Sequence, residues 1–180
     1  MHVAQEKFIL TTGIHGLSKL GFLIQNRKNF DNNISLNERL ISKSIEHFCR
    51  PRVYPNFLNN LLKTRSNKNI KIIGCTDSSD GLFQAVQDLA MASKCKAILN
   101  YEKIPKDKDW PKGDKWDEYY FFGGEDYELV FSLPKKWANN LSKLDKHINE
   151  IGFFTDGEPS IEFKDNKKNK LFNNKPFKHF

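Results

Sequence analysis

Two carboxylates separated by two serines stand within four residues of this chain, in the run Asp77-Ser78-Ser79-Asp80. An isoleucine-rich segment precedes the run and a helix-like segment follows it. We therefore expect Asp77 at the end of a strand and Asp80 in the first turn of a helix, on roughly the same side. Carboxylate oxygens that converge in this way suit Mg²⁺, which takes one or two carboxylates together with phosphate oxygens.

The same run also fits a purely structural role. Ser78 or Ser79 would cap the following helix by accepting a hydrogen bond from a backbone N–H, and Asp80 would interact favourably with the helix dipole. The segment by itself leaves both interpretations open.

A second acidic segment begins with two glycines and runs from Gly123 to Leu129, with the sequence G-G-E-D-Y-E-L. The apolar residues after it end at Pro134, which is typical of a strand closed by proline. Glycines allow a sharp turn and a close approach to a ligand, so the acids would be presented at the start of the strand. A plain hairpin turn would also explain this segment.

In this order, the two segments resemble thiamine-monophosphate kinase, one family in a wider group of ATP-using enzymes that includes aminoimidazole ribonucleotide synthetase. The family's C-terminal domain has a D-x-S-D-G-L segment that opens a helix and a G-G-E-D-Y-E/Q-L segment that starts a strand. Three further segments resemble the family: Thr11 to Leu17 its T-G-x-x-G turn, Arg50 to Val53 its P-R-V segment, and the final His179-Phe180 its aromatic end. The resemblance covers nearly all 180 residues.

The resemblance implies an α+β fold, with a mixed β-sheet covered by helices and partly ferredoxin-like topology, as in the C-terminal domain of the aminoimidazole ribonucleotide synthetase-like superfamily. Residues 1–163 would form this domain, and residues 164–180 a Lys/Asn-rich tail that is ordered in part. The family's N-terminal ATP/Mg domain has no counterpart here. Strands alternating with helices also favour α+β, with a hairpin-like return after Pro159.

The resemblance also implies a reaction, the transfer of the γ-phosphoryl group of ATP to thiamine monophosphate. Asp77 and Asp80 would be the Mg²⁺ ligands, and Ser79 would contact the ATP phosphates through its hydroxyl or backbone N–H. Glu125 would contact the substrate, and no catalytic residue is assigned beyond the metal ligands. The implied partners are ATP, thiamine monophosphate, and a separate N-terminal domain or a dimer partner.

The family has an aromatic residue near its C-terminus that stacks on the substrate. Asn174 occupies that place here, and Phe172 and Phe177 are the candidate replacements.

The sequence leaves two alternative functions open. The chain would be another ATP-dependent enzyme of the same group, or a non-catalytic remnant that binds a partner protein.

Composition excludes several classes of protein. The net charge of +7 comes mostly from residues 63–71 and 164–178 and is not gathered as a nucleic-acid interface requires. No apolar run approaches the roughly 18–20 residues that span a bilayer. The three cysteines show no zinc or CxxC spacing, which indicates buried thiols, a reducing compartment and a cytoplasmic protein.

Periodicity and turn residues predict the order of the elements. The expected strands cover residues 7–12, 70–76, 97–100, 129–133 and 160–163. The expected helices cover 17–25, 36–48 with Ser35 as the cap, 56–64, 82–93 and 137–148. Residues 105–113 are predicted to be irregular, and 149–157 to form a turn region.

Overall fold

The computed structural model describes residues 7–26, 36–52, 54–65 and 74–165. Its strands form one six-stranded sheet in the order β2-β4-β1-β5-β3-β6. The β3–β6 pair is parallel and the other pairs are antiparallel, so the sheet is mixed, as predicted. The strands are β1 (Lys7–Thr12), β2 (Gly74–Asp77), β3 (Lys96–Leu99), β4 (Leu129–Pro134), β5 (Ile148–Thr155) and β6 (Ser160–Phe163).

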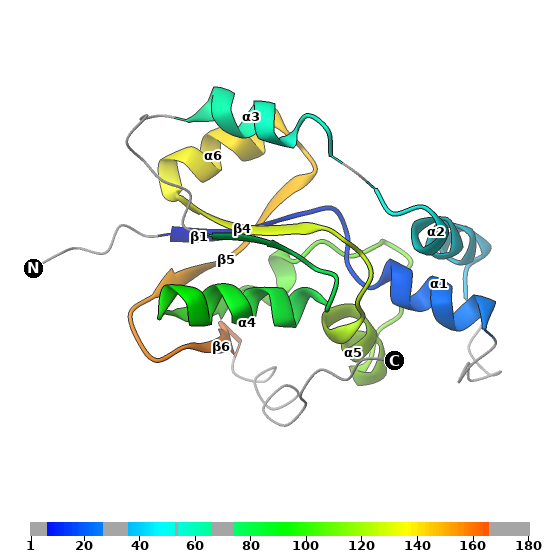
Figure 1. The fold of residues 1–180 in the computed structure, drawn as a ribbon. Coiled ribbons are helices and arrows are strands. Elements are labelled where there is room, and N and C mark those ends of the chain that lie inside the picture. The colour runs from blue at the N-terminus through cyan, green and yellow to red at the C-terminus, as the bar shows by residue number, and fades with distance from the viewer. Residues whose placement is uncertain (1–6, 27–35, 53, 66–73, 166–180) are drawn as a thin grey trace, which may run out of the picture.

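Helices cover both faces of the sheet (Figure 1). They are α1 (Leu17–Gln25), α2 (Glu38–Cys49), α3 (Phe57–Thr64), α4 (Leu82–Ser93), α5 (Asp114–Phe122) and α6 (Lys135–Leu144), with a 3₁₀ turn at Tyr101–Lys103. In Figure 1, α3 and α6 lie above the sheet and α4 lies below it, while α1 and α2 pack together at one end.

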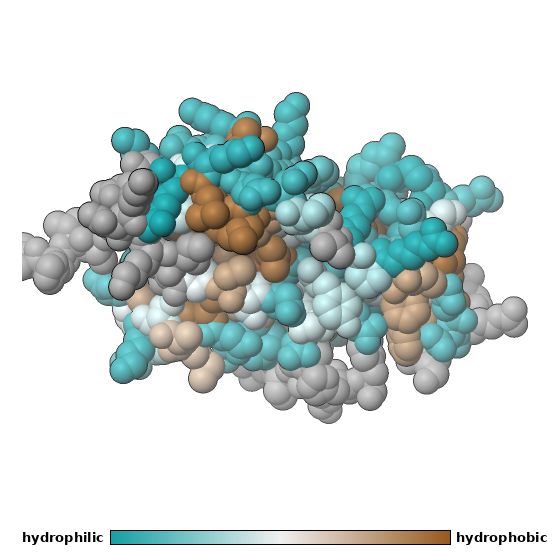
Figure 2. All heavy atoms as spheres, turned by 45° about the horizontal axis from the view of Figure 1, so that its top comes forward, coloured by the Kyte–Doolittle hydropathy of each residue, from teal (hydrophilic) through white to brown (hydrophobic). Residues whose placement is uncertain are grey.

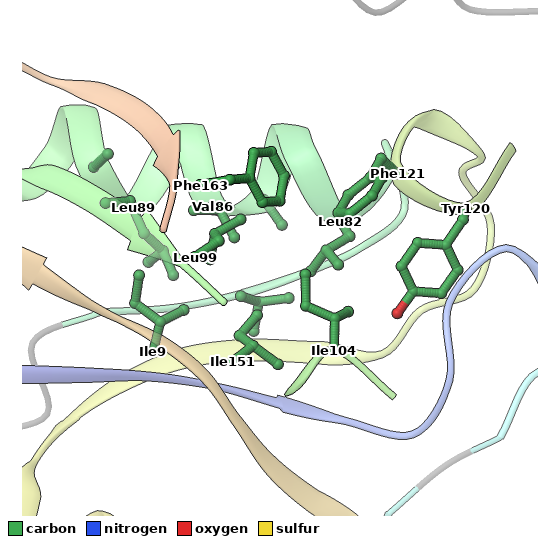
Figure 3. Packing of buried hydrophobic residues seen from close by; sticks show 14 of the residues in the cluster. Ile9, Leu82, Val86, Leu89, Leu99, Ile104, Tyr120, Phe121, Ile151 and Phe163 are labelled. Carbon is green, nitrogen blue, oxygen red and sulfur yellow. The ribbon is translucent and has the colours of Figure 1, made fainter. Parts of the chain in front are cut away.

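Side-chain alternation in β1 divides the interior into two cores. Phe8 and Leu10 belong to the core beneath α3 and α6, which also contains Trp137. Ile9 points to the other face and joins the larger core around α4 and α5, a cluster that also contains Leu82, Leu89 and Leu99 (Figure 3). Each buried side chain of this size stabilises the fold by roughly 1.5–3 kcal/mol. Because β1 contributes side chains to both cores, it connects the two halves of the interior.

The predicted turn region at 149–157 is wrong, because these residues form most of β5, which pairs with β1 and β3. The predicted helix at 137–148 ends at Leu144, and Ile148 already belongs to β5. A register irregularity opposite Ile9 and Leu10 interrupts the alternation of β5. Buried Ile148 and Ile151 are therefore three residues apart, whereas a regular strand buries every second residue, so the sequence does not show the period of a strand here.

The hairpin-like return after Pro159 is also wrong, because β6 pairs with β3 and not with β5. Helix α5 was not expected, and it follows the predicted irregular segment directly. Helix α2 begins later than predicted. Its cap is Asn37, whose side chain accepts the backbone N–H of Arg39 at 2.8 Å, in place of Ser35.

Several predictions fall outside the described residues: the Ser35 position, residues 70–73 of the expected second strand, and residues 166–180 of the tail. The prediction of buried thiols is wrong, because Cys49 and Cys75 are exposed and Cys95 is half-buried. None of the helices in the described ranges has the length and apolar character needed to cross a membrane.

The face formed by α3 and α6 is largely hydrophilic, with an apolar patch in its middle (Figure 2). Leu58 and Leu62 on α3 and Leu144 at the end of α6 each expose more than half of their surface. Exposed leucines are ordinary on protein surfaces, and this patch by itself indicates no function.

Candidate functional site

The Asp77–Asp80 segment forms a loop between β2 and α4. Asp77 is the exposed last residue of β2, and its Oδ1 accepts the backbone N–H of Ser79 at 2.9 Å. Helix α4 begins at Leu82 with Gly81 as its cap and no side-chain cap bond. The capping interpretation of Ser78 and Ser79 is therefore wrong, and Asp80 precedes the helix instead of lying in its first turn.

This loop is hydrogen-bonded to the second acidic segment, which leads into β4. The backbone N–H of Ser78 donates to the carbonyl of Glu128 at 2.9 Å, and the N–H of Glu128 donates to Ser78 Oγ at 3.1 Å. The N–H of Glu125 donates to the carbonyl of Ser79 at 2.8 Å. The two segments singled out from the sequence thus form one structural unit.

Residues 125–128 alternate in their exposure. Glu125 is half-buried and Tyr127 exposed, whereas Asp126 and Glu128 are buried. Glu125 and Tyr127 both have positive φ, at 66° and 54°, which costs a non-glycine residue roughly 1–3 kcal/mol. Strain of this kind is concentrated at functional sites, so this segment is a good candidate for one.

Asp126 holds the start of helix α1. Its Oδ2 accepts the backbone N–H of Gly16 at 2.6 Å, and its Oδ1 accepts that of Ser18 at 2.9 Å. Burial raises the pKa of Asp126 to about 7, although these two hydrogen bonds oppose the shift. Asp126 therefore attaches the turn at Thr12–Gly16 to the second acidic segment and faces away from solvent.

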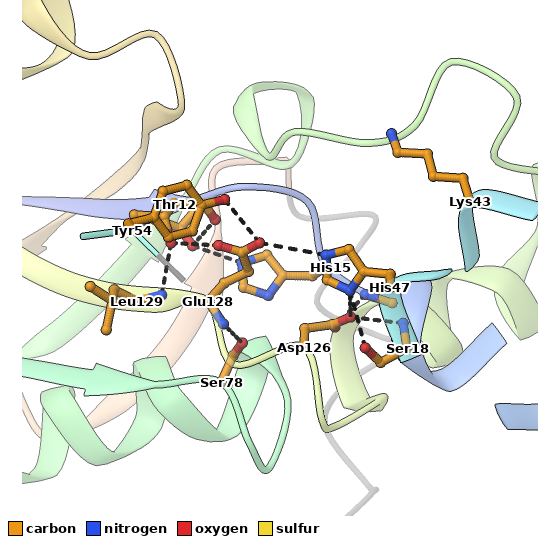
Figure 4. A network of polar contacts seen from close by, with 12 residues as sticks. Thr12, His15, Ser18, Lys43, His47, Tyr54, Ser78, Asp126, Glu128 and Leu129 are labelled. Atoms are coloured by element: carbon orange, nitrogen blue, oxygen red, sulfur yellow. Dashed lines mark hydrogen bonds and ion pairs between the residues drawn. The ribbon is translucent and has the colours of Figure 1, made fainter. Parts of the chain in front are cut away.

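Glu128 organises the interior on the other side of the same turn (Figure 4). Its Oε2 accepts the hydroxyl of Thr12 at 2.6 Å, and its Oε1 accepts that of Tyr54 at 3.1 Å. His47 Nε2 lies 3.7 Å from Oε1. A Cβ at Gly13, whose φ is +54°, would lie 2.0 Å from Oε1, so this turn requires glycine.

His15 belongs to this interior. Its ring is fully buried, Nε2 lies 2.7 Å from Thr11 Oγ1, and burial lowers its pKa to about 4. The imidazole is therefore neutral near pH 7 and has a structural role.

Lys19 was not among the residues that the sequence indicated as functional. Lys19 lies on α1, where burial lowers its pKa and the charge of Glu125 raises it, so the two side chains are electrostatic neighbours. No local signal in the sequence separates Glu125 from Asp126 and Glu128, because these residues precede β4 and two residues of the segment have a left-handed backbone.

The available donor side chains bear on the predicted Mg²⁺ ligands, Asp77 and Asp80. Within the described ranges, no group of three or more His, Cys, Asp or Glu side chains could hold a metal ion. Two carboxylates, those of Asp77 and Asp80, are enough for a Mg²⁺ ion whose remaining ligands are phosphate oxygens of a bound substrate and water. The expected stacking positions Phe172, Asn174 and Phe177 lie outside the described residues.

Comparisons with known proteins point to one family. No protein-family model matches the chain. A thiamine-monophosphate kinase of Prochlorococcus marinus is 31% identical over 173 residues, which are 96% of this chain and 52% of that protein. The chain thus spans about half the length of the curated relatives it matches.

Solved structures share the fold. The thiamine-monophosphate kinase of Stenotrophomonas maltophilia K279a matches with a TM-score of 0.67 and 20% identity, over 88% of this chain and 50% of that one. AaThiL complexed with AMPPCP and TMP matches with a TM-score of 0.68 and 23% identity, over 99% and 52%. The hydrogenase maturation protein HypE matches as well, in agreement with the predicted α+β superfamily fold. This chain is therefore a homologue of the thiamine-monophosphate kinases, related to them over about half of their length.

Proposed function

We propose that this chain supplies part of the active site for ATP-dependent phosphorylation of thiamine monophosphate to thiamine diphosphate. In this reaction an oxygen of the acceptor phosphate bonds to the γ-phosphorus of ATP, the bond between the γ-phosphorus and the bridging oxygen breaks, and ADP leaves. Both substrates are anionic, so positioning and charge neutralisation dominate catalysis.

The observation that carries the proposal is the direct contact between the two acidic segments. The 2.8 Å bond from the Glu125 N–H to the Ser79 carbonyl brings the candidate acceptor contact beside the candidate phosphate loop. A related protein, AaThiL, has been solved with AMPPCP and TMP together, which supports a site for both kinds of ligand in this fold.

Each residue has a distinct role in the proposal. Asp77 and Asp80 would hold Mg²⁺, which neutralises charge on the transferring phosphoryl group when bound. The backbone N–H of Ser79 already donates to Asp77, so its hydroxyl is the group we assign to the ATP phosphates. Glu125 would contact the acceptor, and nearby Lys19 would moderate its charge.

The relatives are about twice as long as this chain, so we propose that residues of their other half complete the site. We expect the 180-residue chain on its own to fold, to bind Mg–ATP weakly and to show no measurable kinase activity, because the phosphates are then held from one side. Adding the other half, taken from a relative, should restore transfer.

The test measures thiamine diphosphate formation by this assembled enzyme. Asp77→Asn and Asp80→Asn should each lower kcat by roughly 10²-fold or more, since each carboxylate positions the ion. Asp88→Asn is the matched control, because Asp88 is an exposed acid on α4 that bonds to Gln84 and lies outside the loop. Turnover near wild type in both loop variants would refute the metal assignment, and an inactive assembly would favour a non-catalytic role.

A further inference from the structure

One imidazole lies between the two buried acids of the second acidic segment. His47, on α2, exposes only 4% of its surface. Its Nδ1 lies 3.8 Å from Oδ1 of Asp126, and its Nε2 lies 3.7 Å from Oε1 of Glu128 (Figure 4). Nδ1 also lies 3.1 Å from Oγ of Ser18 on α1, within hydrogen-bond distance. Opposite edges of a single ring thus face both carboxyl groups.

This arrangement compensates two acids that are removed from water. A buried carboxylate without a partner is strongly unfavourable, and an imidazole supplies a hydrogen-bond donor and, when protonated, an opposite charge. Burial raises the pKa of Asp126 to about 7, and His47 is among the neighbours that oppose this shift. His47 therefore favours the inward position of the acids that it faces.

The two buried acids alternate with the strained residues of the segment. Glu125 and Tyr127 have the left-handed backbone, and each is followed by a buried acid, Asp126 or Glu128. A backbone of this kind persists only where the surrounding structure holds it. Because the inward side chains directly follow the strained residues, the contacts that hold the acids also decide where Glu125 and Tyr127 are presented.

We propose that His47 is a positioning residue of the candidate site: its ring keeps Asp126 and Glu128 inward and thereby fixes Glu125 where it contacts the acceptor. The inference rests on the proposed function, in which Glu125 has that contact. His47 is itself buried, so it touches no ligand and acts only through the second acidic segment. Its hold on the segment and its effect on the reaction are measured in separate experiments.

Three substitutions separate the two edges of the ring. His47→Leu removes both nitrogens. His47→Asn retains a polar atom near the position of Nδ1, and His47→Gln retains one near that of Nε2, so these two variants keep the test decisive if His47→Leu does not fold. Ser44→Ala is the matched control, because Ser44 is also buried on α2 and its hydroxyl has no hydrogen-bond partner among the described residues.

The first experiment measures amide hydrogen exchange in the 180-residue chain by NMR. The backbone N–H of Ser18, which donates to Asp126, and that of Glu125, which donates to Ser79, report on the segment. The amides of the paired strands β1 and β4 report on global unfolding. The ratio of the two exchange rates therefore separates a local release of the segment from a general loss of stability.

His47→Leu should raise this ratio by about tenfold or more, because a contact with charged groups is lost. His47→Asn and His47→Gln should each raise it by less, and Ser44→Ala should leave it unchanged. A ratio that stays at the wild-type value in all three His47 variants would overturn the proposal, since His47 would then stabilise the fold without holding the segment.

The second experiment measures kinetics in the assembled enzyme. His47→Gln should raise KM for thiamine monophosphate by about tenfold, because a slightly displaced contact group binds less well, and KM for ATP should not change. The double variant His47→Gln/Glu125→Gln should be no worse than Glu125→Gln alone, since His47 acts through Glu125. Additive losses would overturn the positioning role and leave the proposed function standing. An inactive wild-type assembly would overturn the role in the reaction together with the proposed function, and the exchange ratios would still decide the hold of His47 on the segment.

Discussion

The contact between the two acidic segments can be tested at Gly124. A Cβ at this position would lie 2.2 Å from the carbonyl oxygen of Ser79, whereas ordinary contacts of a Cβ lie at 3.4–4 Å. The obstructing atom belongs to the backbone, so it cannot move aside as a flexible side chain can. Gly124→Ala must therefore push the Ser79 loop away by about 1 Å.

The cost follows from the bonds that this displacement stretches. The Glu125–Ser79 backbone bond of 2.8 Å would be lost or weakened, which costs about 0.5–1.5 kcal/mol. Overpacking adds about 1–3 kcal/mol. The free energy of unfolding should fall by about 2–4 kcal/mol in all, which corresponds to a decrease in Tm of roughly 5–15 °C for a chain of this size.

Urea unfolding followed by circular dichroism measures this change. Gly74→Ala is the matched control, because Gly74 also has no positive φ and its Cβ would meet only the end of the Leu89 side chain, at 2.7 Å. We expect that control to change stability by less than about 1 kcal/mol. If Gly124→Ala and Gly74→Ala unfold at the same urea concentration, Gly124 does not lie against the Ser79 carbonyl and the two acidic segments are not in contact.

Two further predictions concern single carboxylates. The pKa of Asp126 is raised in the folded state to about 7, so its contribution to stability is present below pH 4 and lost as pH rises to 7. The stability difference between wild type and Asp126→Asn should accordingly shrink by about 1.4 kcal/mol per pH unit across that window, and a difference independent of pH in urea titrations would contradict this assignment. In the assembled enzyme, Glu125→Gln should raise KM for thiamine monophosphate and leave ATP affinity and the melting transition unchanged, whereas loss of cooperative melting would make Glu125 structural.

Local patterns in the sequence determined a large part of the fold. The short apolar run within residues 7–12 and the apolar stripe that begins at Leu82 predicted β1 and α4 with the correct type and near-correct bounds. The proline at 134 marked the end of β4. These elements are recognisable because one side of each faces the apolar interior. The apolar residues on that side recur at regular intervals in the sequence, whichever elements they pack against.

The arrangement of the candidate site depended on tertiary structure. The sequence presents Glu125, Asp126 and Glu128 as three similar acids, and the fold leaves Glu125 partly exposed while burying the other two. Asp126 is buried because it meets Gly16, and Glu128 because it meets Thr12, partners more than a hundred residues away. β5 likewise is an interior strand because it pairs with β1 on one side and with β3 on the other. Hydrogen bonds and registers between distant segments leave no local period. The sequence therefore indicated the candidate segments, and the folded chain decided which of their side chains are buried and which reach the surface.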